Sequence, residues 1–323
     1  MDYIQNIKAP IERELEKFTL QYQSVLQCSN PAVDVLLKFL LERKGKFMRP
    51  ILVLLTAKCF GEIPESVYHS AISFELIHQA SLIHDDVVDE SDKRRGMVSA
   101  NAAFDNKLAV LLGDFVVSKA LIECAATDSV HAVRTLSTLI GNLSEGEITQ
   151  LDALNGEALS EELYFDIITK KTAALFSTSA ELSALLCGAT PGQTAAFSDF
   201  GRIAGLCFQI RDDIFDYQSD ASIGKPTGND LKEGKFTLPA IYAINNSDKD
   251  WSEHIHAIRS LNATPEQIAQ VTDFVVSNGG ISYAEQKMKE LRDQALSALP
   301  ESIPAELKIA FSSYLDLIIN RSK

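Results

Sequence analysis

The sequence predicts an all-α fold, and three features of the chain lead to this prediction. No proline occurs between Pro64 and Pro191, so a long segment lacks the strongest helix breaker. Apolar residues recur at spacings of three and four positions rather than two. No segment combines strand-like alternation with turn residues, and no internal repeat occurs. Because no linker separates two apolar cores, we expect residues 1–323 to form one large domain.

Individual helices can be located from this spacing. The segment "AISFELIHQASLIHDD" carries a stripe that consists of Ile72, Leu76, Ile77, Ala80 and Ile83. Another stripe begins after Gly279–Gly280 and consists of Ile281, Ala284, Met288, Leu291 and Ala295. Pro50 follows a basic loop and favours the start of a helix. Residues 219–239 form the longest irregular segment, and long loops of this kind are commonly functional.

Composition and charge exclude several classes of protein. The net charge of −14 opposes binding to nucleic acid, because phosphate backbones attract basic surfaces. No apolar run approaches the ~20 residues of a membrane span, and the N-terminal residues show no signal-peptide pattern. The five cysteines form no closely spaced pairs, which is typical of reduced thiols. We therefore expect a globular cytoplasmic protein.

Two aspartate clusters with the same spacing are the clearest chemical signal. The first triplet, in "LIHDDVVDESDKRRG", consists of Asp85, Asp86 and Asp89, and the second, in "CFQIRDDIFDYQSD", consists of Asp212, Asp213 and Asp216. Residues four apart on a helix differ by only ~40° in direction, so the outer aspartates share a face. A single triplet is commonly a solvated helix end. Two triplets that face each other would repel because their carboxylates carry like charge, so cations are expected between them. Mg²⁺ prefers such oxygen ligands.

Basic residues near the triplets are candidates for binding phosphate groups. They are Lys46 and Arg49 in "GKFMRP", Arg94 and Arg95 in "RRG", Lys171 in "KKTA", and Lys225 and Lys235 in the long loop. Each of these side chains alone would be ordinary surface charge. Together they exceed what one diphosphate requires, which indicates two diphosphate sites.

In combination, these motifs resemble those of the trans-isoprenyl diphosphate synthases, the chain-elongating prenyltransferases. The matching segments, from Gly45 to Pro239 and in the family's order, are "GKFMRP", "LIHDDVVDESDKRRG", "KKTA", "FQIRDDIFDY" and "GKPTGNDLKEGKFTLP". One DDxxD is a weak signal, but two of them with RRG and GKxxRP are specific. The resemblance implies a single helical bundle of the isoprenoid synthase type, with the active-site cavity between helices.

The resemblance also implies roles for individual residues. Asp85, Asp89 and Asp212 would ligate three magnesium ions, with Asp86, Asp213 and Asp216 as further ligands or as supports behind them. The residues that match the isopentenyl diphosphate site are Lys46, Arg49, His78 and Arg95. Those that match the allylic diphosphate site are Arg94, Lys171, Thr172, Gln209 and Lys225, and Lys235 belongs to the loop that would act as a lid. For His78, the alternative is a core histidine satisfied by a hydrogen bond.

The implied reaction follows from these roles. Magnesium and the basic residues would draw charge from an allylic diphosphate, such as farnesyl or geranyl diphosphate, until its C–O bond breaks. The double bond of isopentenyl diphosphate would then attack the allyl cation, beside the Thr172 hydroxyl and the Gln209 carbonyl. The resulting cation would lose a proton to the departing diphosphate. The 225–235 loop would exclude water. The resemblance further implies a homodimer, and peripheral contact with a membrane is compatible with release of an apolar product.

Small residues before the first triplet predict the length of the product. Ser81 lies one turn before Asp85 on nearly the same face of the helix, and Ala80 is beside it. Phe74 lies ~16 Å from Asp85 along the helix axis and is a candidate for the closed end of a product tunnel. In the resembling family, bulky aromatics at the two small positions mark enzymes with short products. We therefore expect an all-trans chain of about six to ten isoprene units, as in quinone tails. The alternative is that small residues simply allow close helix packing.

Four other functions remain open at this stage. A short-chain farnesyl or geranylgeranyl diphosphate synthase would share every motif. A terpene cyclase would need no "GKFMRP" site for a second diphosphate, and the resemblance implies a different second metal motif there. A noncatalytic subunit of a prenyl synthase would lose aspartates, whereas this chain keeps all six. A helical metal-binding scaffold would show no turnover with both diphosphates and magnesium.

Overall fold

The structure is helical throughout the part of the chain that it describes. This computed structural model describes residues 3–42, 45–94, 96–156, 159–218 and 228–321. In these ranges the only strands are β1 (Lys93–Arg94) and β2 (Met97–Val98), which pair antiparallel. The all-α prediction is therefore confirmed, and the hairpin was missed because two-residue strands show no alternation. None of the helices described has the length and apolar character that crossing a membrane requires.

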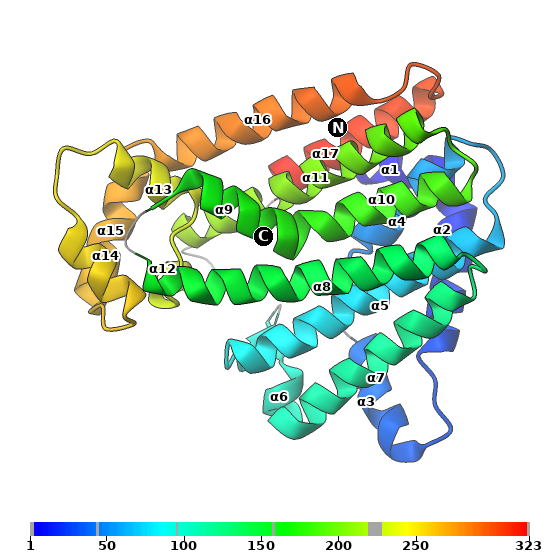
Figure 1. The fold of residues 1–323 in the computed structure, drawn as a ribbon, viewed down its shortest axis with the longest axis horizontal. Helices are drawn as coiled ribbons and strands as arrows, with labels where there is room; N and C mark the ends of the chain where they lie inside the picture. Colours follow the sequence, from blue (N-terminus) through cyan, green and yellow to red (C-terminus); the bar gives the residue numbers. More distant parts are fainter. Residues whose placement is uncertain (1–2, 43–44, 95, 157–158, 219–227, 322–323) are drawn as a thin grey trace. The chain divides into compact units, whose positions relative to one another are not determined.

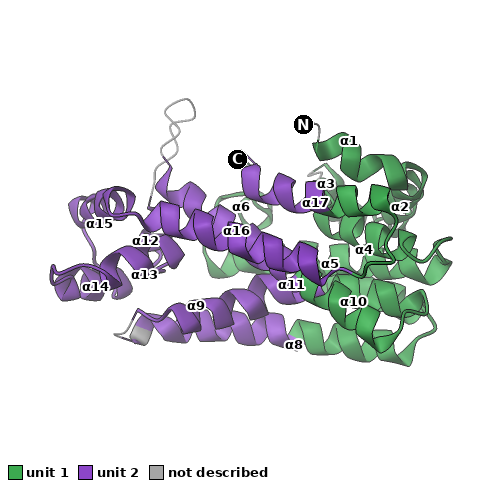
Figure 2. Ribbon diagram, turned by 90° about the horizontal axis from the view of Figure 1, so that it is seen from above, with its two compact units in different colours: residues 1–140, 178–201, 300–311 green, residues 141–177, 202–299, 312–323 purple. Residues whose placement is uncertain are grey.

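The chain divides into two compact units, which Figure 2 shows in different colours. Unit 1 comprises Met1–Ile140, Thr178–Gly201 and Pro300–Phe311, and unit 2 comprises Gly141–Ser177, Arg202–Leu299 and Ser312–Lys323. Four of the five boundaries fall within helices, which are α8 (Val130–Asp152), α10 (Ala174–Leu186), α11 (Pro191–Tyr217) and α17 (Ala305–Asn320), and the fifth falls between Leu299 and Pro300. The first triplet belongs to unit 1 and the second to unit 2.

Unit 1 is organised around one long buried helix. Its complete elements, besides the hairpin, are α1 (Tyr3–Lys8), η1 (Ala9–Ile11), α2 (Glu12–Val25), α3 (Pro31–Leu41), α4 (Met48–Lys58), α5 (Glu65–Val88), α6 (Ala100–Ala103) and α7 (Asn106–Ala125). The predicted stripe on α5 is buried at every position. Helix α7 lies alongside α5 (Figure 1), and α4 packs against α5 as well. This packing fixes the helix that carries the first triplet.

Local sequence signals set several of these helix ends. The Asn30 side chain accepts a hydrogen bond from the Ala32 N–H, and Pro31 follows as the first residue of α3. The Asp105 carboxylate caps α7 by accepting from the Leu108 N–H at 2.8 Å. Pro50 lies in the first turn of α4, which starts two residues earlier at Met48. The predicted helix start is therefore confirmed to within one turn.

Unit 2 contains the second triplet and most of the C-terminal half of the chain. Its complete elements are η2 (Ala153–Asn155), α9 (Glu161–Ile168), η3 (Thr169–Ala173), α12 (Asn229–Lys232), α13 (Leu238–Asn245), α14 (Ser252–Arg259), α15 (Pro265–Ser277) and α16 (Gly280–Ala298). Helix α16 begins at Gly280, as predicted, after Gly279 with φ of 78°. A Cβ on Gly280 would lie 2.4 Å from the Pro239 carbonyl oxygen, so only glycine allows α16 to approach α13 here.

Candidate active site

The first triplet lies where α5 ends, and its middle aspartate is fixed by an arginine. Asp85 and Asp86 are in the last turn, and the Asp89 N–H donates to the Asp85 carbonyl at 2.8 Å. Asp86 is 4% exposed. Arg94 donates to its Oδ1 from Nε at 2.7 Å and from Nη2 at 2.6 Å. The half-buried outer carboxylates, by contrast, lie at the partly solvated end of the helix.

Arg94 reaches Asp86 because the chain turns back directly after α5. Gly96 has φ of 77°, a left-handed conformation that glycine adopts without strain, and it lies at the tip of the β1–β2 hairpin. The Asn101 side chain donates to the Asp86 carbonyl at 3.2 Å and holds the returning chain in place. The "RRG" sequence therefore folds Arg94 onto the triplet. Arg95 lies outside the described residues.

The "GKFMRP" segment forms the start of α4 in the same unit. Phe47 adopts a left-handed conformation with φ of 50° and packs edge-on against Phe18 and Tyr22. This contact holds the turn that places Lys46 at the surface and Arg49, 6% exposed, in the interior. The two basic residues of this segment therefore differ in burial, and only Lys46 lies at the surface.

The residues predicted to set chain length lie on two faces of α5. The Ser73 hydroxyl donates to the Ala120 carbonyl at 2.9 Å, and His84 contacts the Val110 carbonyl at 3.2 Å, so this face meets α7. Ala80, 1% exposed, lies between them by helical spacing and therefore faces α7. Ser81 is half-buried on the Asp85 side, and the Phe74 side chain is fully buried.

His78 lies on this same side of α5. Its imidazole is half-buried, and its carbonyl accepts the Ser81 hydroxyl at 2.9 Å. Its spacing from Asp85 places both side chains on one face of the helix, two turns apart.

The second triplet lies at the end of α11, where each aspartate has a different partner. Asp213 is 4% exposed and accepts from Tyr164 Oη at 2.6 Å and from Gln209 Nε2 at 2.8 Å. Asp216 accepts the backbone N–H groups of Asn229 and Asp230 at 3.0 and 2.9 Å. Asp216 thus anchors the described end of the long loop, and it caps α12.

Asp212 is the most exposed member of the second triplet and pairs with the C-terminal segment. Its Oδ1 lies 2.6 Å from Arg321 Nη2, and its side chain is 44% exposed. The Arg321 guanidinium lies 3.9 Å from the Phe208 ring centroid and donates to the Phe208 carbonyl at 3.1 Å. Arg211 donates in turn to the Arg321 carbonyl at 3.1 Å. Arg321, which follows α17, is therefore held against α11 beside Asp212.

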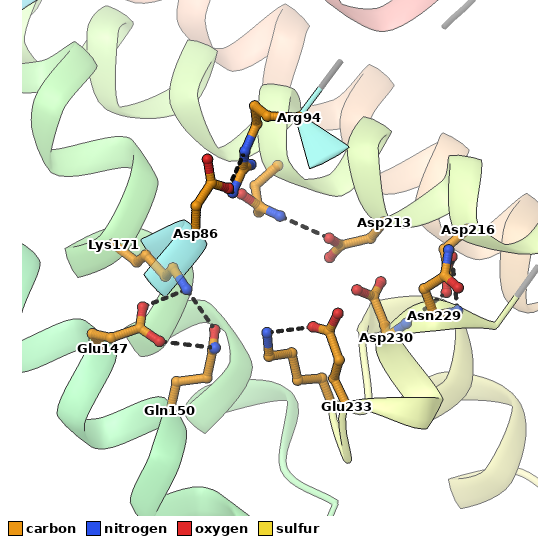
Figure 3. A network of polar contacts seen from close by, with 12 residues as sticks. Asp86, Arg94, Glu147, Gln150, Lys171, Asp213, Asp216, Asn229, Asp230 and Glu233 are labelled. Atoms are coloured by element: carbon orange, nitrogen blue, oxygen red, sulfur yellow. Dashed lines mark hydrogen bonds and ion pairs between the residues drawn. The ribbon is translucent and has the colours of Figure 1, made fainter. Parts of the chain in front are cut away.

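The "KKTA" residues form a π-helical turn, η3, between α9 and α10. Lys171 Nζ pairs with the Glu147 carboxylate and lies 3.4 Å from Gln150 Oε1, and Figure 3 shows it between these two α8 side chains. Thr172 donates its hydroxyl to Gln209 Oε1 at 2.8 Å. Single π-helical turns are frequent at functional sites because they redirect adjacent side chains.

A cavity of about 180 Å³ in unit 2 collects these polar groups. Its predicted members are Lys171, Thr172, Gln209, Asp213 and Lys235, and its other polar members include Gln150, Ser160, Tyr164, Asp230, Thr237 and Arg259. Apolar side chains from α9, such as Leu163 and Ile167, complete the wall. A mixed cavity of this kind suits a ligand with a charged head and an apolar tail. Lys225 lies outside the described residues.

Burial perturbs the acids of this cavity. Burial raises the pKa of Asp213 from 3.8 to about 7, and its neighbours Asp212 and Asp216 add to the shift, while Tyr164 and Gln209 oppose it. Burial also raises the pKa of Asp230 well above its usual range, with Asp213 and Asp216 as the nearest negative charges. Strongly perturbed acids in a cavity are a sign of a functional site.

Sequence reasoning missed several residues that contact the predicted ones. They are Tyr164, Glu147, Gln150, Asp230 and Arg321. Tyr164 had a signal, because it lies two turns before Lys171 in one helical segment. Arg321 had none, since its contact with Asp212 spans most of the C-terminal half of the chain.

Comparison with known proteins agrees with this arrangement. Residues 30–275 match the polyprenyl synthetase family. The octaprenyl diphosphate synthase of Haemophilus influenzae is 33% identical over all of this chain and 97% of its own length. The crystal structure of geranylgeranyl pyrophosphate synthase from Bacteroides thetaiotaomicron is 39% identical, with a TM-score of 0.86 over 99% of this chain and all of that one. A polyprenyl synthase structure from Caulobacter crescentus, complexed with calcium and isoprenyl diphosphate, is 29% identical, with a TM-score of 0.91 over 98% of both chains. The chain therefore belongs to the polyprenyl synthetase family and is a prenyltransferase.

Proposed function

We propose that this prenyltransferase condenses isopentenyl diphosphate with an allylic diphosphate in successive steps. The product would be an all-trans polyprenyl diphosphate of about six to ten isoprene units, suited to a quinone side chain. The observation that carries the proposal is the cavity of unit 2, where Lys171, Thr172, Gln209 and Asp213 meet from separate motifs. The cavity offers cations for a diphosphate and apolar α9 side chains for a prenyl tail.

The aspartates fit magnesium as a cofactor. Among the described residues, no three acidic, histidine or cysteine side chains already converge as a complete metal site. The donor chemistry nevertheless matches, because carboxylate oxygens with retained water and phosphate oxygens are the ligands that Mg²⁺ prefers. Asp86, Asp213 and Asp216 are already held by protein donors. Asp212 also pairs with Arg321, but its side chain is 44% exposed. In line with the resemblance to the family, we assign Asp85, Asp89 and Asp212 as the ligands and the other three as residues that position them.

Magnesium, when bound, would supply Lewis-acid stabilisation of the leaving diphosphate. The chain's own cations would bind the remaining phosphate oxygens. Arg94 uses Nε and Nη2 for Asp86 and keeps Nη1 for a phosphate, while Lys171 has three donors and two protein partners. Thr172 and Gln209 would direct oxygen lone pairs at the allyl cation as the C–O bond breaks.

The basic residues should separate the two substrates. Arg49→Ala should raise the KM for isopentenyl diphosphate about 10- to 100-fold, because one charge-assisted contact contributes about 1.5–3 kcal/mol. Lys171→Ala should do the same for the allylic substrate. Steady-state kinetics with each substrate varied in turn would measure both constants. Equal effects of both variants on one constant would contradict the assignment.

Product length is the point on which the relatives differ. The 39% identical geranylgeranyl pyrophosphate synthase favours a twenty-carbon product as the alternative. The small side chain of Ser81, on the same face of α5 as the buried Phe74, supports the longer chain. Chromatography of the products formed from isopentenyl and farnesyl diphosphates decides between them. A twenty-carbon product would establish the alternative.

The two small positions should respond differently to bulky substitutions. Ser81→Phe should shorten the product to about fifteen or twenty carbons, because Ser81 shares the Asp85 face. Ala80→Tyr should chiefly destabilise the protein, by about 1–3 kcal/mol, because Ala80 faces α7. Product chromatography and thermal melts of both variants would test this. Identical product lengths in Ser81→Phe and the unchanged protein would remove Ser81 from the product path.

We further propose that the protein is a homodimer and that each chain is one domain. Helix α7 exposes a stripe of apolar residues, with Leu111 61% and Ile122 62% exposed, which would suit contact with a second copy. Sedimentation that shows only monomer would contradict the dimer. Four of the five unit boundaries lie within continuous helices, which supports a single domain. Such a domain would unfold in one calorimetric transition.

A further inference from the structure

Tyr164 is a buried residue that none of the sequence motifs includes. Its side chain is 6% exposed on α9, and it lines the cavity of unit 2. Its hydroxyl donates to Asp213 Oδ2 at 2.6 Å, a short charge-assisted hydrogen bond. Because a buried hydroxyl needs a partner, this contact orients both the tyrosine and the carboxylate.

The hydrogen bond from Tyr164 begins a chain of contacts that ends at Thr172, which also lines the cavity. Gln209 Nε2 donates to Asp213 Oδ1 at 2.8 Å, and Gln209 Oε1 accepts the Thr172 hydroxyl at 2.8 Å. Both carboxylate oxygens are therefore engaged, so rotation of Asp213 would break both contacts. The carboxylate in turn fixes which end of the Gln209 amide faces Thr172, since only the amino end can donate to it.

Contacts with α16 and a capping residue hold α9 in place, so Tyr164 is a fixed hydrogen-bond donor. Glu161, at its start, accepts from Tyr283 Oη at 2.9 Å and lies 3.6 Å from Lys287 Nζ, both on α16. Tyr283 also stacks on Tyr242 of α13, with ring centroids 4.0 Å apart. The Ser160 side chain caps α9 by accepting from the Leu163 N–H at 3.1 Å. A donor on a braced helix holds its acceptor more firmly than one on a loop.

The Tyr164 phenol is an uncharged donor, which suits a site where an allyl cation would form. An arginine in this place would also bind Asp213, but its charge would oppose an allyl cation in the same cavity. A phenol supplies a strong hydrogen bond without adding positive charge. The neutral partner therefore fixes the Asp213 side chain without placing a further positive charge in the cavity wall.

We infer that Tyr164 is a positioning residue for the allylic substrate. Through Asp213 it sets the orientation of the Gln209 amide, which leaves oxygen lone pairs of Gln209 and Thr172 directed at the allylic carbon. This inference rests on the proposed prenyl transfer. It assigns Tyr164 no contact with the reacting atoms, so its effect should pass entirely through Gln209 and Asp213.

The test compares Tyr164→Phe with Tyr68→Phe. Tyr68 is 4% exposed at the start of α5, ~25 Å along the helix from Asp85, and so matches the burial without the contact. Tyr164→Phe should lower kcat about tenfold and raise the allylic KM severalfold, with the KM for isopentenyl diphosphate unchanged. Binding of an unreactive thiolo analogue of farnesyl diphosphate, measured by calorimetry, should weaken by a similar factor. Tyr68→Phe should change none of these.

A double-mutant cycle identifies the route of the effect. If Tyr164 acts through Gln209, then Tyr164→Phe should have little further effect in a Gln209→Ala background. Multiplicative losses in the double variant would overturn the inference, as would a Tyr164→Phe variant with a lower melting temperature and unchanged kinetics. Absence of turnover in the unsubstituted protein would instead refute the proposed function, so the two failures are distinguishable.

Discussion

The two aspartate triplets have identical spacing but different surroundings. Each ends a long helix and each buries its middle carboxylate, Asp86 on α5 and Asp213 on α11. Asp86 is held by the guanidinium of Arg94, whereas Asp213 is held by the neutral donors Tyr164 and Gln209. The middle carboxylate is therefore stabilised by a cation in unit 1 and by neutral hydrogen-bond donors in unit 2.

The last aspartates of the two triplets, Asp89 and Asp216, also have different surroundings. Asp89 lies one residue beyond α5, near a hairpin that returns immediately. Asp216 is still inside α11, and its carboxylate caps α12 after a longer excursion of the chain. The difference shows that a repeated motif fixes the positions of carboxylates on a helix but not their electrostatic environment. The environment depends on whichever segment packs against the helix end.

The largest expected effect concerns Asp85 and Asp212, two of the carboxylates that we assign as metal ligands. Asp85→Ala and Asp212→Ala should each lower kcat on the order of 1,000-fold, because several kcal/mol of charge stabilisation would be lost. Steady-state turnover at saturating magnesium and substrates measures this, with the exposed Asp248→Ala as control. A loss confined to one triplet would show that the triplets are unequal in function as well as in surroundings.

A smaller effect should separate the two ways of holding the middle aspartate. Arg94→Ala would leave Asp86 buried without its cation and should lower the free energy of unfolding by about 2–3 kcal/mol. This is less than for a fully buried pair, because the Arg94 side chain is 35% exposed. Tyr164→Phe leaves Asp213 with its Gln209 donor and should cost about 1 kcal/mol.

Urea unfolding of both variants in the presence of a chelator would measure the difference. Arg94→Lys is a useful intermediate, since it keeps the charge but loses the two-pronged contact with Oδ1. Equal losses for Arg94→Ala and Tyr164→Phe would mean that the charge of the partner is unimportant. The stability of each middle aspartate would then depend only on how many hydrogen bonds it accepts.

The sequence was sufficient to predict what depends on local spacing. The apolar stripe of α5 is buried as expected, α16 starts at Gly280, and the all-α class is confirmed. The family was also predictable, because its motifs are short and contiguous. The cavity of unit 2 collects Lys171, Thr172 and Gln209 from two motifs that the sequence had already marked.

What the sequence did not reveal are contacts between distant segments. Tyr164 and Asp213 are 49 positions apart, and Asp212 pairs with Arg321, the last described residue. Neither partner belongs to a motif, and a tyrosine or arginine on a helix carries no signal of what it will touch. The environment of each aspartate follows from tertiary packing, which single-sequence patterns do not encode.

The smallest expected effect is a pH dependence of stability that only the second triplet should show. Burial raises the pKa of Asp213 from 3.8 to about 7. Between these values the folded protein binds a proton that the unfolded chain has released, so stability falls as pH rises through this window and levels off above about 7. Asp213 contributes at most about 1.4 kcal/mol per pH unit to this slope. Asp213→Asn should remove that contribution in chelator-treated protein, measured as melting temperature from pH 5 to 8. The amide alters the contacts with Tyr164 and Gln209, so the slope rather than the absolute stability is the informative quantity.

Asp86→Asn serves as the matched control at the first triplet and should leave the slope in place, because Arg94 already balances that carboxylate. A slope that survives in Asp213→Asn would mean that another acid of the cavity, such as Asp230, carries the proton.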